Sequence, residues 1–274
     1  MTPATRVSVI IPVRDDPAVV RTVRAVRAAR EGFAGDIEVL FFTDADCEPC
    51  PGWIAEGLRH IDRGASVVQG FSGSVGATRG DALIQWRYEA HLRPLAPGDS
   101  TECDTRNLAV RREVFDRVRF NGAWRRASDT EFGLMAEGAG AAVEYCPAMR
   151  VQHSHNPDLR IFVAKQICHG WGAQRIMREH PEVRWHGGHL RIVAAVSRAV
   201  GYWPLNVWGA PAIGRAALAG ASLLERWGGV LPFRLQAALL TALDKAGALA
   251  GHLMYELGGE EPRPSVLAGR TSLD

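Results

Sequence analysis

The chain lacks a strong net charge and any long hydrophobic segment. It has 274 residues, with 32 Lys and Arg against 30 Asp and Glu and a formal net charge of +2, so no strong electrostatic field favours a nucleic acid partner. The longest stretch without a charged residue, residues 199–214, contains two prolines and is too short and broken for a membrane-spanning helix. No charged-then-apolar leader precedes Val7, from which we expect a cytoplasmic protein.

Paired cysteines are also missing. The chain has five cysteines, and only Cys47 and Cys50 form a C-x-x-C, a spacing that zinc sites and redox sites use. A structural zinc site needs a second pair of ligands at matching spacing, and none is evident. A redox C-x-x-C normally opens a helix, whereas here Pro49 and Pro51 flank Cys50. We therefore expect free thiols in a reducing compartment.

The sequence does have a regular alternation of strands and helices. Short apolar runs at residues 7–11, 37–42 and 65–70 are typical of buried strands. Residues 51–63 and 81–91 have the composition of helices, and a further helix is expected after Pro17. Strands that alternate with helices through short connections predict an α/β fold with a doubly wound, mostly parallel sheet.

Two carboxylates end the most buried of these strands. Asp44 and Asp46 follow the apolar run 37–42 in the order Asp-Ala-Asp, and ligands of open α/β sheets bind beyond the carboxyl ends of strands. Carboxylates so placed can hold a hard divalent cation together with a phosphate-bearing ligand. The alternative is a solvated acidic turn, since proline and glycine follow. The spacing alone leaves both interpretations open.

Four segments in order place this pair in context. They are VSVIIPVRDD at 7–16, DADCEPCPGW at 44–53, NLAVRREVF at 107–115, and SDTE at 128–131 with VQHSH at 151–155. Together they resemble the family 2 glycosyltransferases, and the likeness covers roughly residues 7–156. The resemblance implies a GT-A fold. It also implies an inverting, metal-dependent transfer of a sugar from a nucleotide-diphosphate sugar to the hydroxyl of an acceptor that the sequence does not identify.

The resemblance also assigns residues to the donor and the metal. It implies donor-binding residues at Pro12, Arg14, Asp16, Asp44 and Asp46. It implies that Mn²⁺ or Mg²⁺ binds Asp46 and His153 together with the donor diphosphate. His153 and His155 stand two apart on an expected strand, so their side chains point to opposite faces. At most one of them can reach the metal, and the resemblance selects His153.

The same resemblance implies that Asp129 is the general base. A base must accept the acceptor's proton as the new bond forms. Ser128 stands where the family has a Glu, so one carboxylate of the usual pair is lost, and Glu131 is the substitute candidate. The alternative is that Asp129 only caps the helix that follows.

The front half is shorter than in the family. One helix separates the first strand from the Asp-Ala-Asp strand, where relatives place two further strands. We therefore expect the first strand to form an edge of the sheet. The missing strands and the lost Glu also raise an alternative function, a non-catalytic homologue that binds a sugar or a partner.

Three regions are expected along the chain. Residues 1–184 form the glycosyltransferase domain, and residues 185–257 form a helical region rich in Ala and Leu. That region could pack on the domain, form a homodimer interface or lie on a membrane surface. The polar residues 258–274 are expected to be a disordered tail.

Overall fold

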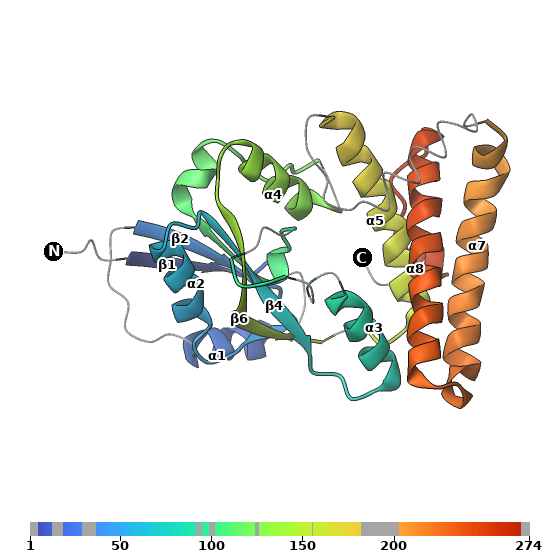
Figure 1. The fold of residues 1–274 in the computed structure, drawn as a ribbon, viewed down its shortest axis with the longest axis horizontal. Coiled ribbons are helices and arrows are strands. Elements are labelled where there is room, and N and C mark those ends of the chain that lie inside the picture. Colours follow the sequence, from blue (N-terminus) through green and yellow to red (C-terminus); the bar gives the residue numbers. More distant parts are fainter. Residues whose placement is uncertain are drawn as a thin grey trace. The chain divides into compact units, whose positions relative to one another are not determined.

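The chain forms two units. The computed structural model describes residues 5–12, 19–28, 37–90, 92, 95–98, 102–123, 126–154, 156–181 and 203–269. Residues 1–75 and 91–155 belong to the first unit, and residues 76–90 and 156–274 belong to the second. The first unit holds the sheet and the second is helical (Figure 1).

The first unit is built on a six-stranded sheet. Its strands are β1 (Thr5–Ile10), β2 (Ile37–Phe42), β3 (Cys47–Pro49), β4 (Val67–Ser74), β5 (Leu108–Arg111) and β6 (Val143–His153). They lie in the order β1-β2-β5-β4-β6-β3. β1 is therefore an edge strand, as the shortened front half predicted.

The α/β class is confirmed, but the sheet is mixed. β1 pairs with β2 and β4 pairs with β6 in parallel, whereas β5 runs antiparallel to both of its neighbours and β3 runs antiparallel to β6. Four of the six strands nevertheless run in the same direction, as expected for a mostly parallel sheet; they are β1, β2, β4 and β6. A short apolar strand such as β5 has the same pattern of buried residues in either direction, so its sequence does not encode its orientation.

Both faces of the sheet are covered by helices. The helical elements of this unit are α1 (Val19–Ala28), α2 (Trp53–Asp62), α4 (Ser128–Gly138) and the short η1 (Thr105–Asn107) and η2 (Arg112–Asp116). Val39 and Phe41 of β2 pack with α2 on one face, and Phe42 packs with Phe132 of α4 on the other. The alternation follows from the two-residue period of a strand. Because both faces are apolar, residues 39–42 form a continuous apolar run, with Glu38 near the start of the strand.

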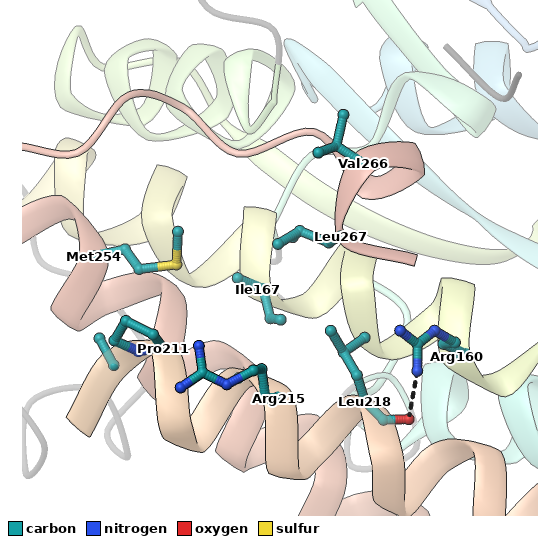
Figure 2. Close-up of a pocket in the computed structure, with 10 residues that line it drawn as sticks. Arg160, Ile167, Pro211, Arg215, Leu218, Met254, Val266 and Leu267 are labelled. Carbon is teal, nitrogen blue, oxygen red and sulfur yellow. Dashed lines mark hydrogen bonds between the residues drawn. The ribbon is translucent and has the colours of Figure 1, made fainter. Parts of the chain in front are cut away.

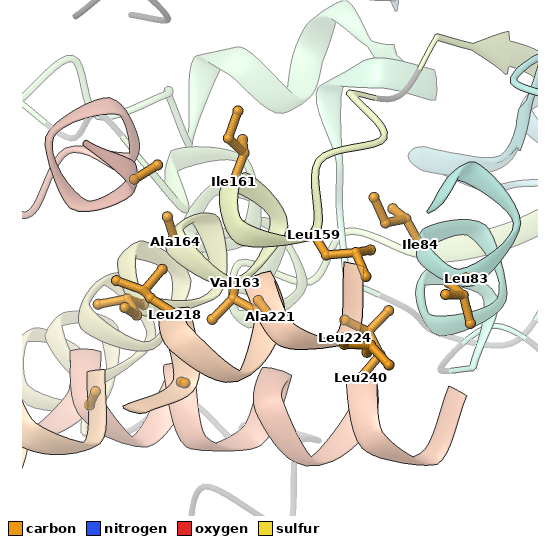
Figure 3. Packing of buried hydrophobic residues seen from close by; sticks show 14 of the residues in the cluster. Leu83, Ile84, Leu159, Ile161, Val163, Ala164, Leu218, Ala221, Leu224 and Leu240 are labelled. Atoms are coloured by element: carbon orange, nitrogen blue, oxygen red, sulfur yellow. The ribbon is translucent and has the colours of Figure 1, made fainter. Parts of the chain in front are cut away.

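The second unit is a helical bundle. Its elements are α3 (Arg79–Glu89), α5 (Leu159–Glu179), α7 (Trp203–Trp227), η3 (Gly228–Val230), α8 (Phe233–Glu256) and α9 (Pro264–Ala268). Figure 3 shows part of its core, where Val163 of α5 and Leu218 of α7 lie among the buried residues. Among the described residues, no helix combines the length and the apolar character needed to cross a bilayer. α9 lies within the segment expected to be a disordered tail, and its Ala268 is buried.

A cavity of about 470 Å³ lies within this bundle (Figure 2). Apolar side chains of α5, α7, α8 and α9 make up most of its lining, with Arg160 and Arg215 at its border. Arg160 donates hydrogen bonds to the carbonyl oxygens of Ala268 at 3.1 Å and Leu218 at 3.5 Å. These bonds tie α5 to α9 and α7, so this arginine has a structural role.

Glycine lets α5 and α8 pack backbone against backbone. A Cβ on Gly251 would collide with the carbonyl group of Ile167, and one on Gly170 would collide with that of Ala248. We expect Gly251→Ala to lower the stability of the second unit by about 1–3 kcal/mol, measured as a lower melting temperature. The control is Gly209→Ala in α7, where a Cβ meets nothing within 4 Å and stability should rise by about 0.5–1 kcal/mol. Equal shifts for the two variants would contradict the close helix contact.

Candidate active site

The turn after β2 is fixed from the side by α1. The buried Thr22 hydroxyl oxygen lies 2.6 Å from the carbonyl oxygens of both Ala45 and Cys47. These two residues flank Asp46, and the backbone N–H of Ser154 also donates to the Asp46 carbonyl oxygen at 3.2 Å. The Asp-Ala-Asp turn is therefore held by hydrogen bonds from two different elements.

β6 brings a histidine to this turn. His153 is the last residue of β6 and pairs with Cys47 of β3, and its Nε2 lies 3.3 Å from Oδ2 of Asp46. The ligand atoms of Asp46, Cys47 and His153 all lie within 4.8 Å of one another. This group could hold a metal ion, and it contains both residues that the resemblance assigns to the metal.

Asp44, the other aspartate of the turn, has a raised pKa. The pKa of Asp44 is raised from 3.8 to about 6, mainly by burial and then by the negative charge of Asp104, while Arg106 acts in the opposite direction. The charge of Asp46 also raises this pKa, and His153 lowers it. Asp44 thus interacts electrostatically with residues from three separate parts of the chain.

Asp129 lies in the same electrostatic environment. Burial, followed by the charge of Asp104, raises the pKa of Asp129 to about 6, while hydrogen bonds from backbone N–H groups, including that of Thr130 at 2.9 Å, lower it. Asp129 as a whole residue is only partly buried. A carboxyl with a pKa near neutrality on such a residue suits a general base.

Asp129 is not the helix cap. α4 begins at Ser128, and its N-cap is Ala127, which makes no side-chain cap hydrogen bond. Ala127 has φ 61°, and it is the only residue other than glycine with positive φ in the described part of the chain. This left-handed conformation costs an alanine roughly 1–2 kcal/mol. The expectation that Ser128 or Asp129 is the N-cap was therefore wrong. Asp129 lies inside the first turn of α4, where its carboxylate accepts a hydrogen bond from the Thr130 N–H.

Sequence reasoning missed Asp104 and Arg106. Asp104 accepts hydrogen bonds from the backbone N–H of Arg106 at 3.0 Å and from its guanidinium, with which it forms an ion pair. The backbone N–H of Asp104 donates to Oε1 of the buried Gln69 at 2.7 Å. The only signal in the sequence is the polar interruption Asp-Thr-Arg before the strand at 108. Only the fold brings this carboxylate close enough to affect both Asp44 and Asp129.

A buried asparagine joins the elements beneath the site. The Asn107 side chain accepts a hydrogen bond from Nε1 of Trp53 at 2.7 Å and donates to the carbonyl oxygens of Phe71 at 2.9 Å and Met149 at 2.8 Å. The pairing of β4 with β6 shifts register between Gly70 and Phe71. Asn107 therefore connects α2, the β4 irregularity and β6.

Removing this side chain should be costly. Asn107→Ala leaves a buried N–H and two buried carbonyl groups without their partner, at about 1–3 kcal/mol for each unsatisfied group. We expect a loss of about 3 kcal/mol or more in the free energy of unfolding, measured by urea denaturation. The control is Asn121→Ala, because among the described residues the Asn121 side chain accepts one exposed turn hydrogen bond, from the N–H of Ala123. Similar losses for both variants would show that Asn107 is not a central connection.

The structure describes some of the remaining predicted residues and not others. Glu131 is buried on α4, and Pro12 is exposed just beyond β1. Arg14, Asp16 and His155 lie outside the described residues. All five cysteines are free, as predicted. Burial raises the pKa of the Cys47 thiol, which disfavours the thiolate that zinc or redox chemistry needs.

No protein-family model matches the chain, and no curated protein matches it. Several solved structures are similar, including three crystal structures. The crystal structure of GalNAc-T7 with UDP, GalNAc and Mn²⁺ is 17% identical, with a TM-score of 0.34 over 59% of this chain and 38% of that one. That of S. aureus TarS 1–349 is 14% identical, with a TM-score of 0.36 over 89% and 72%. That of a mycobacterial protein is 18% identical, with a TM-score of 0.29 over 57% and 52%.

The chain therefore spans 38% of the GalNAc-T7 chain and 52% of the mycobacterial one. All three TM-scores are below 0.5. Likenesses this weak identify neither a family nor an activity.

Proposed function

We propose that the chain is an inverting glycosyltransferase of the family 2 type, with a GT-A-like fold. It would transfer a sugar from a nucleotide-diphosphate sugar to an acceptor hydroxyl. The observation that carries the proposal is the carboxylate-rich site formed by the turn after β2, the end of β6, the start of α4 and the segment before β5. The family resemblance places donor, metal and base residues at three of these four positions.

Asp129 would be the general base. Its carboxylate takes the proton from the acceptor hydroxyl while the hydroxyl oxygen bonds to the anomeric carbon and the bond to the nucleoside diphosphate breaks. A single displacement with no protein nucleophile inverts the anomeric configuration. The charge of Asp104 beside Asp129 strengthens the base, because it raises the pKa of that carboxyl.

Asp46 and His153 would hold Mn²⁺ or Mg²⁺. One carboxylate and one imidazole, with donor phosphate oxygens completing the site, are ligands suited to these ions. When bound, the cation would neutralise negative charge on the diphosphate leaving group. Cys47 is the third member of the cluster, but a buried protonated thiol is a poor ligand for a hard cation.

The arrangement does not favour the non-catalytic alternative. That reading depended partly on the loss of the Glu at position 128. Asp104 lies close enough to raise the pKa of Asp129, so a second carboxylate is present in space although it is absent from the motif.

Transfer from labelled donors tests the proposal. Wild-type protein and Asp129→Asn are incubated with Mn²⁺, each of several labelled nucleotide-diphosphate sugars, and a cell extract that supplies acceptors. We expect label from at least one donor to enter a product only with the wild type. Equal incorporation by both proteins, or none from any donor, would contradict the proposal.

A further inference from the structure

The turn between α7 and α8 carries an unusual concentration of exposed apolar side chains. More than half of the exposed large hydrophobic residues in the described part of the chain lie within residues 223–239, which we name the hairpin tip. They are Leu223, Trp227, Val230, Phe233, Leu235 and Leu239. Their exposed fractions range from 37% at Phe233 to 84% at Val230. Single exposed hydrophobic residues are normal, whereas apolar residues gathered in one region of a surface are typical of protein or membrane interaction sites.

The inner side of the hairpin is built from other residues. Leu224, Gln236 and Leu240 form its buried inner side, and Gly228 lets the turn pass close to Leu224. Arg79 of α3 fastens the tip from the side, donating hydrogen bonds at 2.8 Å to Oε1 of Gln236 and to a backbone carbonyl oxygen. The exposed apolar residues therefore belong to a turn that buried side chains and hydrogen bonds hold in place.

The charge of the tip is basic. Arg226 and Arg234 are exposed, and Glu225 is the only acidic residue within 223–239. The Arg226 guanidinium lies 5.2 Å from the centre of the Trp227 ring. Tryptophan and arginine side by side are typical of the membrane–water interface, where the indole enters the headgroup region and the guanidinium meets lipid phosphates.

We propose that the hairpin tip docks the second unit on the surface of a membrane containing anionic phospholipids. Trp227, Val230 and Phe233 enter the boundary between headgroups and acyl chains, and Arg226 and Arg234 pair with lipid phosphates. The pairing of Trp227 with Arg226, and the net charge of +1 within residues 223–239, favour this occupant over a neutral apolar partner. An interfacial element of this kind lies on the bilayer and does not span it. The proposal does not depend on the proposed glycosyl transfer.

Vesicle cosedimentation tests it with the whole chain. We expect binding to vesicles of phosphatidylcholine mixed with phosphatidylglycerol, little binding to phosphatidylcholine alone, and weaker binding at high salt. A Trp227→Ser, Val230→Ser double variant should bind about tenfold more weakly, because it loses apolar area that inserts. Arg226→Gln and Arg234→Gln should each weaken binding about fivefold at low salt, from roughly 1 kcal/mol per basic residue.

The matched control is Val266→Ser, which removes an exposed valine of α9 outside the tip and should leave vesicle binding unchanged. Circular dichroism confirms that each variant is folded. The proposal is overturned if the wild type ignores anionic vesicles or if the tip variants bind as the wild type does. A third outcome would also overturn it: the wild type is a dimer, the tip variants are monomers, and neither binds vesicles. The tip would then be a subunit interface.

Discussion

Asp129→Asn is expected to lower kcat/KM by about 10² to 10⁴, the usual contribution of a general base. Asparagine keeps the size of the side chain but cannot take a proton from the acceptor hydroxyl. The amide oxygen of asparagine can still accept the Thr130 N–H that the carboxylate accepts at the start of α4. The measurement is the rate of sugar transfer, or of donor hydrolysis until an acceptor is known. Glu137→Gln, an exposed position on the same helix, is the control and should keep full activity.

The pH dependence gives this prediction a second readout. Since the pKa of Asp129 is raised to about 6, wild-type activity should fall as pH drops below about 6. In the folded state this pKa lies above the ordinary value of 3.8. Between pH 3.8 and about 6 the folded state therefore binds more protons than the unfolded state, and the free energy of unfolding falls as pH rises through this range. At pH 7, Asp129→Asn should therefore be more stable than wild type by about 2 kcal/mol, discounted for the partial exposure of the residue.

Full turnover in a folded Asp129→Asn variant would show that Asp129 is not the base. Glu131, buried on the same helix, would then be the next carboxylate to test.

Asp46→Ala is expected to abolish the gain in nucleotide affinity that Mn²⁺ provides. Loss of the carboxylate removes a charged ligand and several kcal/mol of cation binding, so the Mn²⁺-dependent affinity for a nucleoside diphosphate should fall about 100-fold or more. The measurement is the rise in melting temperature with nucleotide, recorded with and without Mn²⁺, because a ligand that binds the folded state stabilises it.

Two variants sharpen that result. Glu48→Gln alters a neighbouring carboxylate on β3 and should leave the metal dependence intact. Cys47→Ser should do the same, since a hard cation does not need the thiol; loss of metal dependence there would indicate a softer ion such as zinc. An unchanged Mn²⁺ response in Asp46→Ala would remove Asp46 from the metal site.

The sequence was informative wherever a signal is local. The mostly apolar run 37–42 predicted β2 and placed Asp44 and Asp46 just beyond its end. The single helix between the first two strands predicted that β1 is an edge. The resemblance paired His153 with Asp46 across more than 100 residues of chain, and Nε2 and Oδ2 of these residues lie 3.3 Å apart.

What the sequence could not supply depends on long-range geometry. Nothing in the polar segment around Asp104 indicates that its charge acts on both Asp44 and Asp129, because that depends on where β5 lies in the sheet. Nothing in the sequence distinguishes Thr22 from other helical residues, but the fold places its hydroxyl beside the carbonyl oxygens of the two residues that flank Asp46. The orientation of β5 and the left-handed Ala127 were also hidden, since neither is encoded by apolar periodicity.

The most direct test of the account is a calorimetric titration of the purified protein with UDP, GDP and dTDP, each with and without Mn²⁺. Binding of at least one nucleotide, clearly tighter with Mn²⁺, is the predicted result for a site built on Asp46 and His153. Failure of all three to bind in the presence of the metal would contradict a nucleotide-sugar glycosyltransferase.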